Sequence, residues 1–178
     1  MKRAVLFCAL LALSACQWDP PHQGARDGGV PALEVGGYGP LHIGMSLQDA
    51  RASTGQAMNS AAFGDESTCV EEPFYAADGD TLYAMFEHGR LTRITVNNQA
   101  MHTRTVQNIG VGSKEEEVRT AYTNVVLAPR LATDPSARSL VVWTEPSKSG
   151  LRFEIDGGGQ VMSIHAGAAS IMDVQGCA

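Results

Sequence analysis

The sequence contains no apolar run long enough to cross a lipid bilayer. Its most apolar stretch covers residues 4–15, directly after Met1, Lys2 and Arg3. Twelve helical residues rise about 18 Å at ~1.5 Å each, whereas the hydrocarbon core of a bilayer is ~30 Å thick. A basic start, a short apolar segment and small residues are typical of a cleaved secretion signal. The sequence therefore predicts an exported protein whose signal peptide spans residues 1–15.

Motifs of common catalytic and nucleotide-binding sites are also missing. There is no G-x-S-x-G, no H-E-x-x-H, no P-loop and no C-x-x-C, and the five histidines are scattered. Asp78-Gly79-Asp80 lacks the later ligands of a calcium loop, and the glycine run 157–159 fits a hairpin turn. The sequence predicts no catalytic residues, no metal site, no cofactor and no enzyme activity.

Basic residues are scarce, with 13 Lys and Arg against 19 Asp and Glu. Cleavage of the signal would remove Lys2 and Arg3 and raise the acidic excess from six to eight. An acidic chain without a basic stripe is poorly suited to nucleic acid or to anionic lipid headgroups. The aromatic content of 6% weighs mildly against a carbohydrate-binding module. The composition therefore favours proteins, sugars or cationic surfaces as partners.

The end of the apolar segment, Leu13-Ser14-Ala15-Cys16, resembles the lipobox of bacterial lipoproteins. That resemblance implies that Cys16 carries a thioether-linked diacylglyceryl group and becomes the first residue of the mature chain. Two or more acyl chains give stable membrane anchoring. By the same resemblance, Gln17 in place of an aspartate implies delivery to the outer membrane, facing the periplasm. An ordinary cleaved signal with a chance cysteine is the alternative.

The remaining cysteines predict a disulfide bond. Cys8 leaves with the signal and Cys16 is the expected lipid site, so Cys69 and Cys177 are left in an oxidising compartment. Two free buried thiols are the alternative. Neither cysteine has a second Cys or His at zinc-ligand spacing.

The mature chain divides into a tether and one domain. Residues 16–37 are rich in proline and glycine, which is typical of a flexible linker. The remaining residues, 38–178, have the usual size of one compact domain.

That domain contains an internal repeat. Residues 43–51 align without gaps on residues 111–119, and each segment predicts a short helix after an apolar-Gly step. Ser46 with Asp49, and Ser113 with Glu116, have the spacing of a helix N-cap. Residues 82–94 and 151–164 predict β-hairpins, and further strands are expected at 68–76, 139–144 and 125–128. The predicted units are 38–107 and 108–178.

The fold class predicted is α+β, with two tandem helix-plus-antiparallel-strand repeats forming one sheet and the helices on one face. Period-two alternation places one set of hairpin residues under the helices: Leu82, Ala84, Phe86, Leu151, Phe153 and Ile155. The opposite face is expected to be open, and its large side chains are of the kinds that binding surfaces favour. The predicted partner-binding residues are Tyr83, Met85, Arg93, Trp143, Arg152 and His165.

This pattern of Gly-Met-Ser helix start, strands and aromatic-rich hairpin resembles the tandem-repeat fold of the β-lactamase inhibitory protein family. A single unit also resembles the small SmpA/OmlA-type lipoproteins of outer-membrane assembly. Both families bind proteins and neither is enzymatic, so the resemblance implies an inhibitor, an immunity-type factor or an assembly accessory. A carbohydrate or cell-wall binding module is the alternative.

Overall fold

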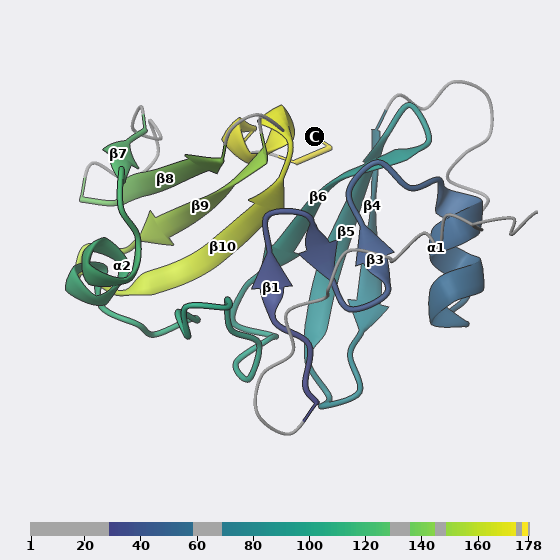
Figure 1. The fold of residues 1–178 in the computed structure, drawn as a ribbon, viewed down its shortest axis with the longest axis horizontal. Coiled ribbons are helices and arrows are strands. Elements are labelled where there is room, and N and C mark those ends of the chain that lie inside the picture. The colour runs from purple at the N-terminus through teal and green to yellow at the C-terminus, as the bar shows by residue number, and fades with distance from the viewer. Residues whose placement is uncertain (1–28, 59–68, 129–135, 145–148, 174–175, 178) are drawn as a thin grey trace, which may run out of the picture.

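The computed structural model describes residues 29–58, 69–128, 136–144, 149–173 and 176–177. The predicted signal peptide, Cys16 and residues 17–28 of the predicted tether lie outside these ranges. The described chain is a mixed α and β fold with one seven-stranded antiparallel sheet and one three-stranded sheet (Figure 1).

The elements follow one another in two runs. The first run is β1 (Leu33–Glu34), β2 (Gly37–Tyr38), β3 (Leu41–His42), α1 (Leu47–Thr54), β4 (Cys69–Tyr75), β5 (Thr81–Glu87) and β6 (Arg90–Val96). The second run is α2 (Glu115–Ala121), β7 (Val126–Leu127), β8 (Arg138–Thr144), β9 (Ser149–Ile155), β10 (Val161–Gly167) and the 3-10 helix η2 (Ala169–Met172). The large sheet has the order β4-β5-β6-β10-β9-β8-β7, so β6 and β10 meet at its centre.

Both predicted hairpins are confirmed. β5 pairs with β6 and β9 pairs with β10, each antiparallel. The β5–β6 turn uses His88 and Gly89, both with positive φ, as a two-residue hairpin turn requires. The strands expected at 68–76, 139–144 and 125–128 are β4, β8 and β7.

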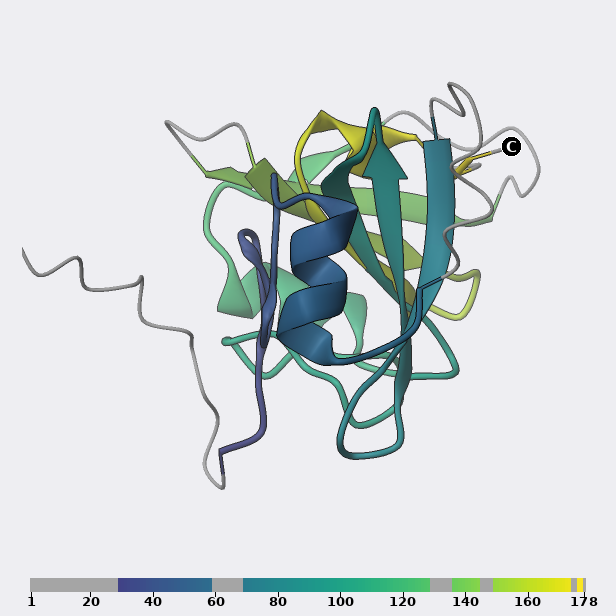
Figure 2. The same cartoon turned by 90° about the vertical axis from the view of Figure 1, so that its right-hand side faces the viewer.

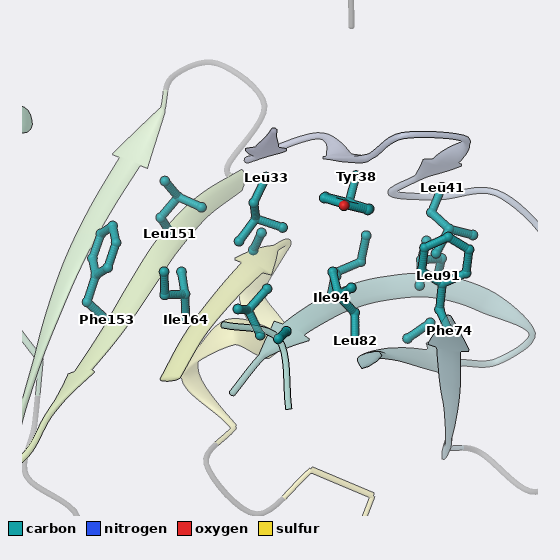
Figure 3. Packing of buried hydrophobic residues seen from close by; sticks show 14 of the residues in the cluster. Leu33, Tyr38, Leu41, Phe74, Leu82, Leu91, Ile94, Leu151, Phe153 and Ile164 are labelled. Carbon is teal, nitrogen blue, oxygen red and sulfur yellow. The ribbon is translucent and has the colours of Figure 1, made fainter. Parts of the chain in front are cut away.

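The core lies between one face of the large sheet, here called the inner face, and the helices with the small sheet. The six hairpin residues predicted to face the helices are all buried. Leu33, Tyr38 and Leu41 from the small sheet pack onto Leu82, Leu91 and Ile94 (Figure 3). Both helices add side chains to the same cluster, namely Leu47, Ala50 and Val118. Side chains from both helices and from the small sheet therefore contribute to one core.

The two helices begin differently from each other. α1 follows the prediction, because the Asp49 N–H donates to Ser46 Oγ over 3.1 Å and Gly55 ends the helix with φ of 67°. α2 does not, because its N-cap is Lys114, whose N–H donates to the Glu117 carboxylate over 2.6 Å. Ser113 is instead buried and accepts the Gly110 N–H, which takes it out of the predicted capping role. Within the described residues, neither helix is long and apolar enough to cross a membrane.

The predicted tether is too long at its C-terminal end. Leu33 and Ala32 are buried, and β1 and β2 begin the small sheet before residue 38. The Leu33 N–H also donates to the Arg104 carbonyl over 2.9 Å. Proline and glycine content suggested a linker, but the apolar Leu33 anchors this stretch to the core, so the folded domain includes it.

A buried carboxylate fixes the segment that leaves β6. Asp80 accepts hydrogen bonds from the N–H groups of His102 and Thr103 and from the Thr103 hydroxyl. Burial alone would raise the pKa of Asp80, but the bonds from Thr103 and His102 outweigh it and lower the pKa. Asp80 therefore remains ionised and ties the chain between the two halves of the sheet to β5.

Candidate functional site

The face of the large sheet away from the core, here called the outer face, carries all six residues predicted to bind a partner. Cross-strand register arranges them in two adjacent rows. The first row runs Glu71, Met85, Arg93, Gly167, Gly150 and Trp143. The second row runs Pro73, Tyr83, Thr95, His165, Arg152 and Val141.

The C-terminal end of the chain lies across this face and covers part of it. We call residues 168–173 and 176–177 the C-terminal strap. Figure 2 shows the C-terminus beside β4, on the side of the sheet opposite α1. Ile171 of the strap is fully buried against the first row, where a Cβ on Gly150 would lie 3.1 Å from its Cδ1. Glycine at position 150 therefore makes room for the strap to pack directly onto the sheet.

Arg93 holds one part of the strap. Its guanidinium donates to the Ser170 carbonyl over 3.2 Å and to the Asp173 carbonyl, and it pairs with Glu71 over 3.2 Å. The Ser170 carbonyl also accepts the Asp173 N–H over 3.1 Å, within the last turn of η2. Carbonyls at the C-terminal end of a helical turn carry partial negative charge, which the buried guanidinium complements.

Arg152 holds the neighbouring part of the strap and is 1% exposed. It donates to the Met172 carbonyl over 3.0 Å and to the Ser139 hydroxyl over 3.0 Å. Its Nε lies 2.6 Å from the Glu154 carboxylate, which also accepts the Ser139 hydroxyl over 2.7 Å. The result is a buried ion pair in which both partners have further hydrogen bonds.

The expectation of an open face is therefore wrong for three of the six residues. Met85, Arg93 and Arg152 are 0%, 3% and 1% exposed and cannot present a contact surface in this state. Strand alternation assigned them to the correct face. It could not show that a segment about eighty residues beyond Arg93 covers that face.

The other three residues keep access to solvent. Trp143 is 38% exposed, and a Cβ on Gly150 would lie 2.9 Å from its ring atom Cε3. Tyr83 is half-buried and its hydroxyl donates to the Gln99 side chain over 3.1 Å. His165 is half-buried beside Thr95. Met172, which the sequence analysis missed, adds an exposed side chain at the end of η2.

His165 lies between two fixed cations. Burial lowers its pKa to about 3, and the positive charges of Arg93 and Arg152 act in the same direction. Its Nδ1 is 3.0 Å from the Thr95 hydroxyl and its Nε2 is 3.5 Å from the Ser163 hydroxyl. The imidazole of His165 is therefore neutral near pH 7.

Acid should therefore weaken the fold through His165. Between pH 6.5 and 3 the unfolded chain binds a proton at this position and the folded protein does not, so the free energy of unfolding falls as the pH falls. The limiting slope is about 1.4 kcal/mol per pH unit for this one group. His165→Gln keeps a polar partner for Thr95 and removes the titration. Urea unfolding at several pH values from 7 to 4 should show a flatter loss for the variant, and parallel curves would contradict this assignment.

The described residues contain no group of three or more His, Cys, Asp or Glu side chains able to hold a metal ion. They do form a groove of about 620 Å³ beside the small sheet. Its apolar lining includes Pro31, Tyr38, Phe74 and Tyr75. The sequence analysis missed this groove, because residues from β2, β4 and the end of α1 meet there only in the folded chain.

Comparison with known proteins places the chain in no family. No family model matches it, and no curated protein sequence does. A crystal structure of an extracellular SCP-domain protein from Bacillus anthracis str. Ames aligns with a TM-score of 0.46 and 7% identity. The alignment covers 75% of this chain and 46% of that one, so this chain spans less than half the length of that protein. A likeness of this size carries no argument about function.

Proposed function

We propose that this protein is an envelope-anchored lipoprotein that binds another protein through the exposed part of its outer face. The observation that carries the proposal is the presence of two exposed apolar side chains, Trp143 of β8 and Met172 of the strap, which are 38% and 36% exposed. Tryptophan and methionine are enriched in protein interfaces relative to the rest of the surface.

The two side chains have rigid support. Trp143 packs on Gly150, and Ile171, the neighbour of Met172, packs on the same glycine. Arg152 fixes the Met172 carbonyl. An apolar contact surface that is already ordered loses little conformational entropy when a partner binds, which favours affinity.

The proposed location in the cell envelope rests on the lipobox-like sequence at Cys16. Residues 16–28 lie between this cysteine and the first described residue, Gly29. A fully extended chain of this length spans at most ~45 Å. An acylated Cys16 would therefore keep the outer face within a short distance of the outer membrane, where a periplasmic or membrane-bound partner can be reached.

Two tandem repeat units are part of the same proposal, and backbone contacts at the two helix starts support it. The Gly44 N–H donates to the Leu91 carbonyl over 2.7 Å, and the Gly112 N–H donates to the Val161 carbonyl over 2.8 Å. Both glycines have positive φ, of 91° and 84°. Each acceptor lies near the start of the second strand of a hairpin, in β6 and in β10. This matched geometry fits the resemblance to the two families of protein-binding proteins.

Photo-crosslinking in intact cells tests the proposal. A photoreactive phenylalanine analogue at Trp143 or at Tyr83 should give one discrete protein adduct. The same analogue at the exposed Glu116 of α2, on the inner side of the molecule, should give none. Adducts of equal strength at all three positions would contradict the proposal, as would retention on peptidoglycan beads without any protein adduct.

A further inference from the structure

We propose that the C-terminal strap is a disulfide-held cover, and that reduction of the Cys69–Cys177 bond uncovers Met85 and Arg93 on the outer face. The inference goes beyond the proposed function, since it assigns two states to the face and needs no partner for its test. The bond joins the middle of the chain to its C-terminus, with a Cα–Cα distance of 5.3 Å.

The first and last parts of the strap are held to the sheet by different contacts. Its first part has its own anchors: the buried Ile171, the Ala168 N–H donating to the Thr92 carbonyl over 3.0 Å, and the Ser170 hydroxyl on the same carbonyl. Its last part includes the described residues Asp173, Gly176 and Cys177, and the disulfide links Cys177 to β4. None of these three residues buries a large side chain, and a terminal segment frays unless it is held in place. The disulfide holds this part in place.

The last part lies over the Met85 end of the first row. A Cβ on Gly176 would lie 3.2 Å from both Arg93 Nη2 and Glu71 Oε2. Met85 stands between Glu71 and Arg93 in the cross-strand register and is fully buried, although its side chain points away from the core. Gly176 of the strap therefore lies against both cross-strand neighbours of Met85.

The proposed switch is a thiol–disulfide exchange with a dithiol reductant. One thiolate of the reductant attacks a sulfur of the bond and forms a mixed disulfide. Its second thiol then displaces the protein sulfur, leaving two protein thiols and one oxidised reductant. Cys69 and Cys177 are only half-buried, so a reductant can reach the bond.

Opening of the strap would expose further side chains on the outer face. Met85 and Arg93 would then lie in solvent beside the half-buried Tyr83 of the same strand pair. Met and Arg are among the residues enriched in interfaces. The oxidised protein would present a smaller binding surface than the reduced one.

Methionine footprinting tests the cover directly. Wild type and the Cys69→Ser/Cys177→Ser variant are treated with hydrogen peroxide, and the oxidation rate of each methionine is followed by peptide mass spectrometry. Met85 should be oxidised at least tenfold faster in the variant. Met101 and Met162, exposed in both proteins, should react at unchanged rates and serve as internal standards.

Amide hydrogen exchange of β9 and β10 in the same two proteins separates local opening from unfolding. Amides of β9 and β10 should stay protected in both proteins, with protection lowered in the variant by no more than its loss of global stability, while Met85 is oxidised faster. A Met85 rate equal to that of wild type would overturn the proposal. So would a complete loss of protection in β9 and β10, because the disulfide would then support the whole sheet and not a cover.

Discussion

Replacing Arg152 by methionine is expected to lower the free energy of unfolding by about 3–5 kcal/mol. The substitution leaves the Glu154 carboxylate buried without its 2.6 Å cation and leaves the Met172 carbonyl without its donor. Methionine fills much of the volume of the arginine side chain, so the loss of stability comes from removing the Arg152 charge and not from creating a cavity. Urea unfolding monitored by the fluorescence of Trp143 measures it.

A double-mutant cycle provides the control. Glu154→Gln in the Arg152→Met background should recover part of the stability, because the unpaired buried charge is then gone. A single-variant loss below ~1 kcal/mol, or strictly additive losses in the double variant, would contradict the structural role assigned to the pair.

Removal of the disulfide should cost about 2–5 kcal/mol. The bond closes a loop between cysteines 108 positions apart, for which chain entropy gives up to ~4.7 kcal/mol. Cys69→Ala and Cys69→Ala/Cys177→Ala should lose the same amount, since either change breaks the same link. Native protein exported to an oxidising compartment should show no reactive thiol at Cys69 or Cys177, and labelling of both would contradict the bond.

The sequence was sufficient to predict the regular part of the fold. Alternation in residues 82–94 and 151–164 gave both hairpins and their core-facing residues, because a period of two and a Gly-containing turn are local signals. The cysteine count gave the disulfide, and Ser46 gave the start of α1. The hairpins and the start of α1 depend on residues that are close together in sequence. The disulfide could be predicted because only two cysteines remained to pair.

Features that depend on distant segments could not be predicted. The small sheet consists of strands of two residues, which are too short to show alternation. The strap contains little apolar sequence beyond Ile171 and Met172, and its hold on the sheet comes from Arg93 and Arg152 in strands far away along the chain. Arginine at an alternating position predicts a solvated face by default. Its burial here follows from backbone carbonyls that no sequence pattern marks.

The candidate site also depends on a segment that is distant in sequence, and it could be predicted only in part. Six residues were assigned to one face, and they share it, but only Trp143, Tyr83 and His165 keep access to solvent. Met172 comes from the covering segment and completes the exposed apolar pair. A binding surface composed of a sheet residue and a residue from the cover is visible only in the folded chain.

The central claim is that this exposed part of the outer face binds a protein partner. Its most direct test is the dissociation constant of the partner identified by crosslinking, measured with Trp143→Ala and with Val106→Ala. Val106 is more exposed than Trp143 and follows Thr105, which pairs with Leu33 of the small sheet, so it is the matched control away from the outer face. Trp143→Ala should weaken binding at least about fivefold, more than ~1 kcal/mol, and Val106→Ala should leave it unchanged. Equal affinities for wild type and a folded Trp143→Ala variant would contradict the claim.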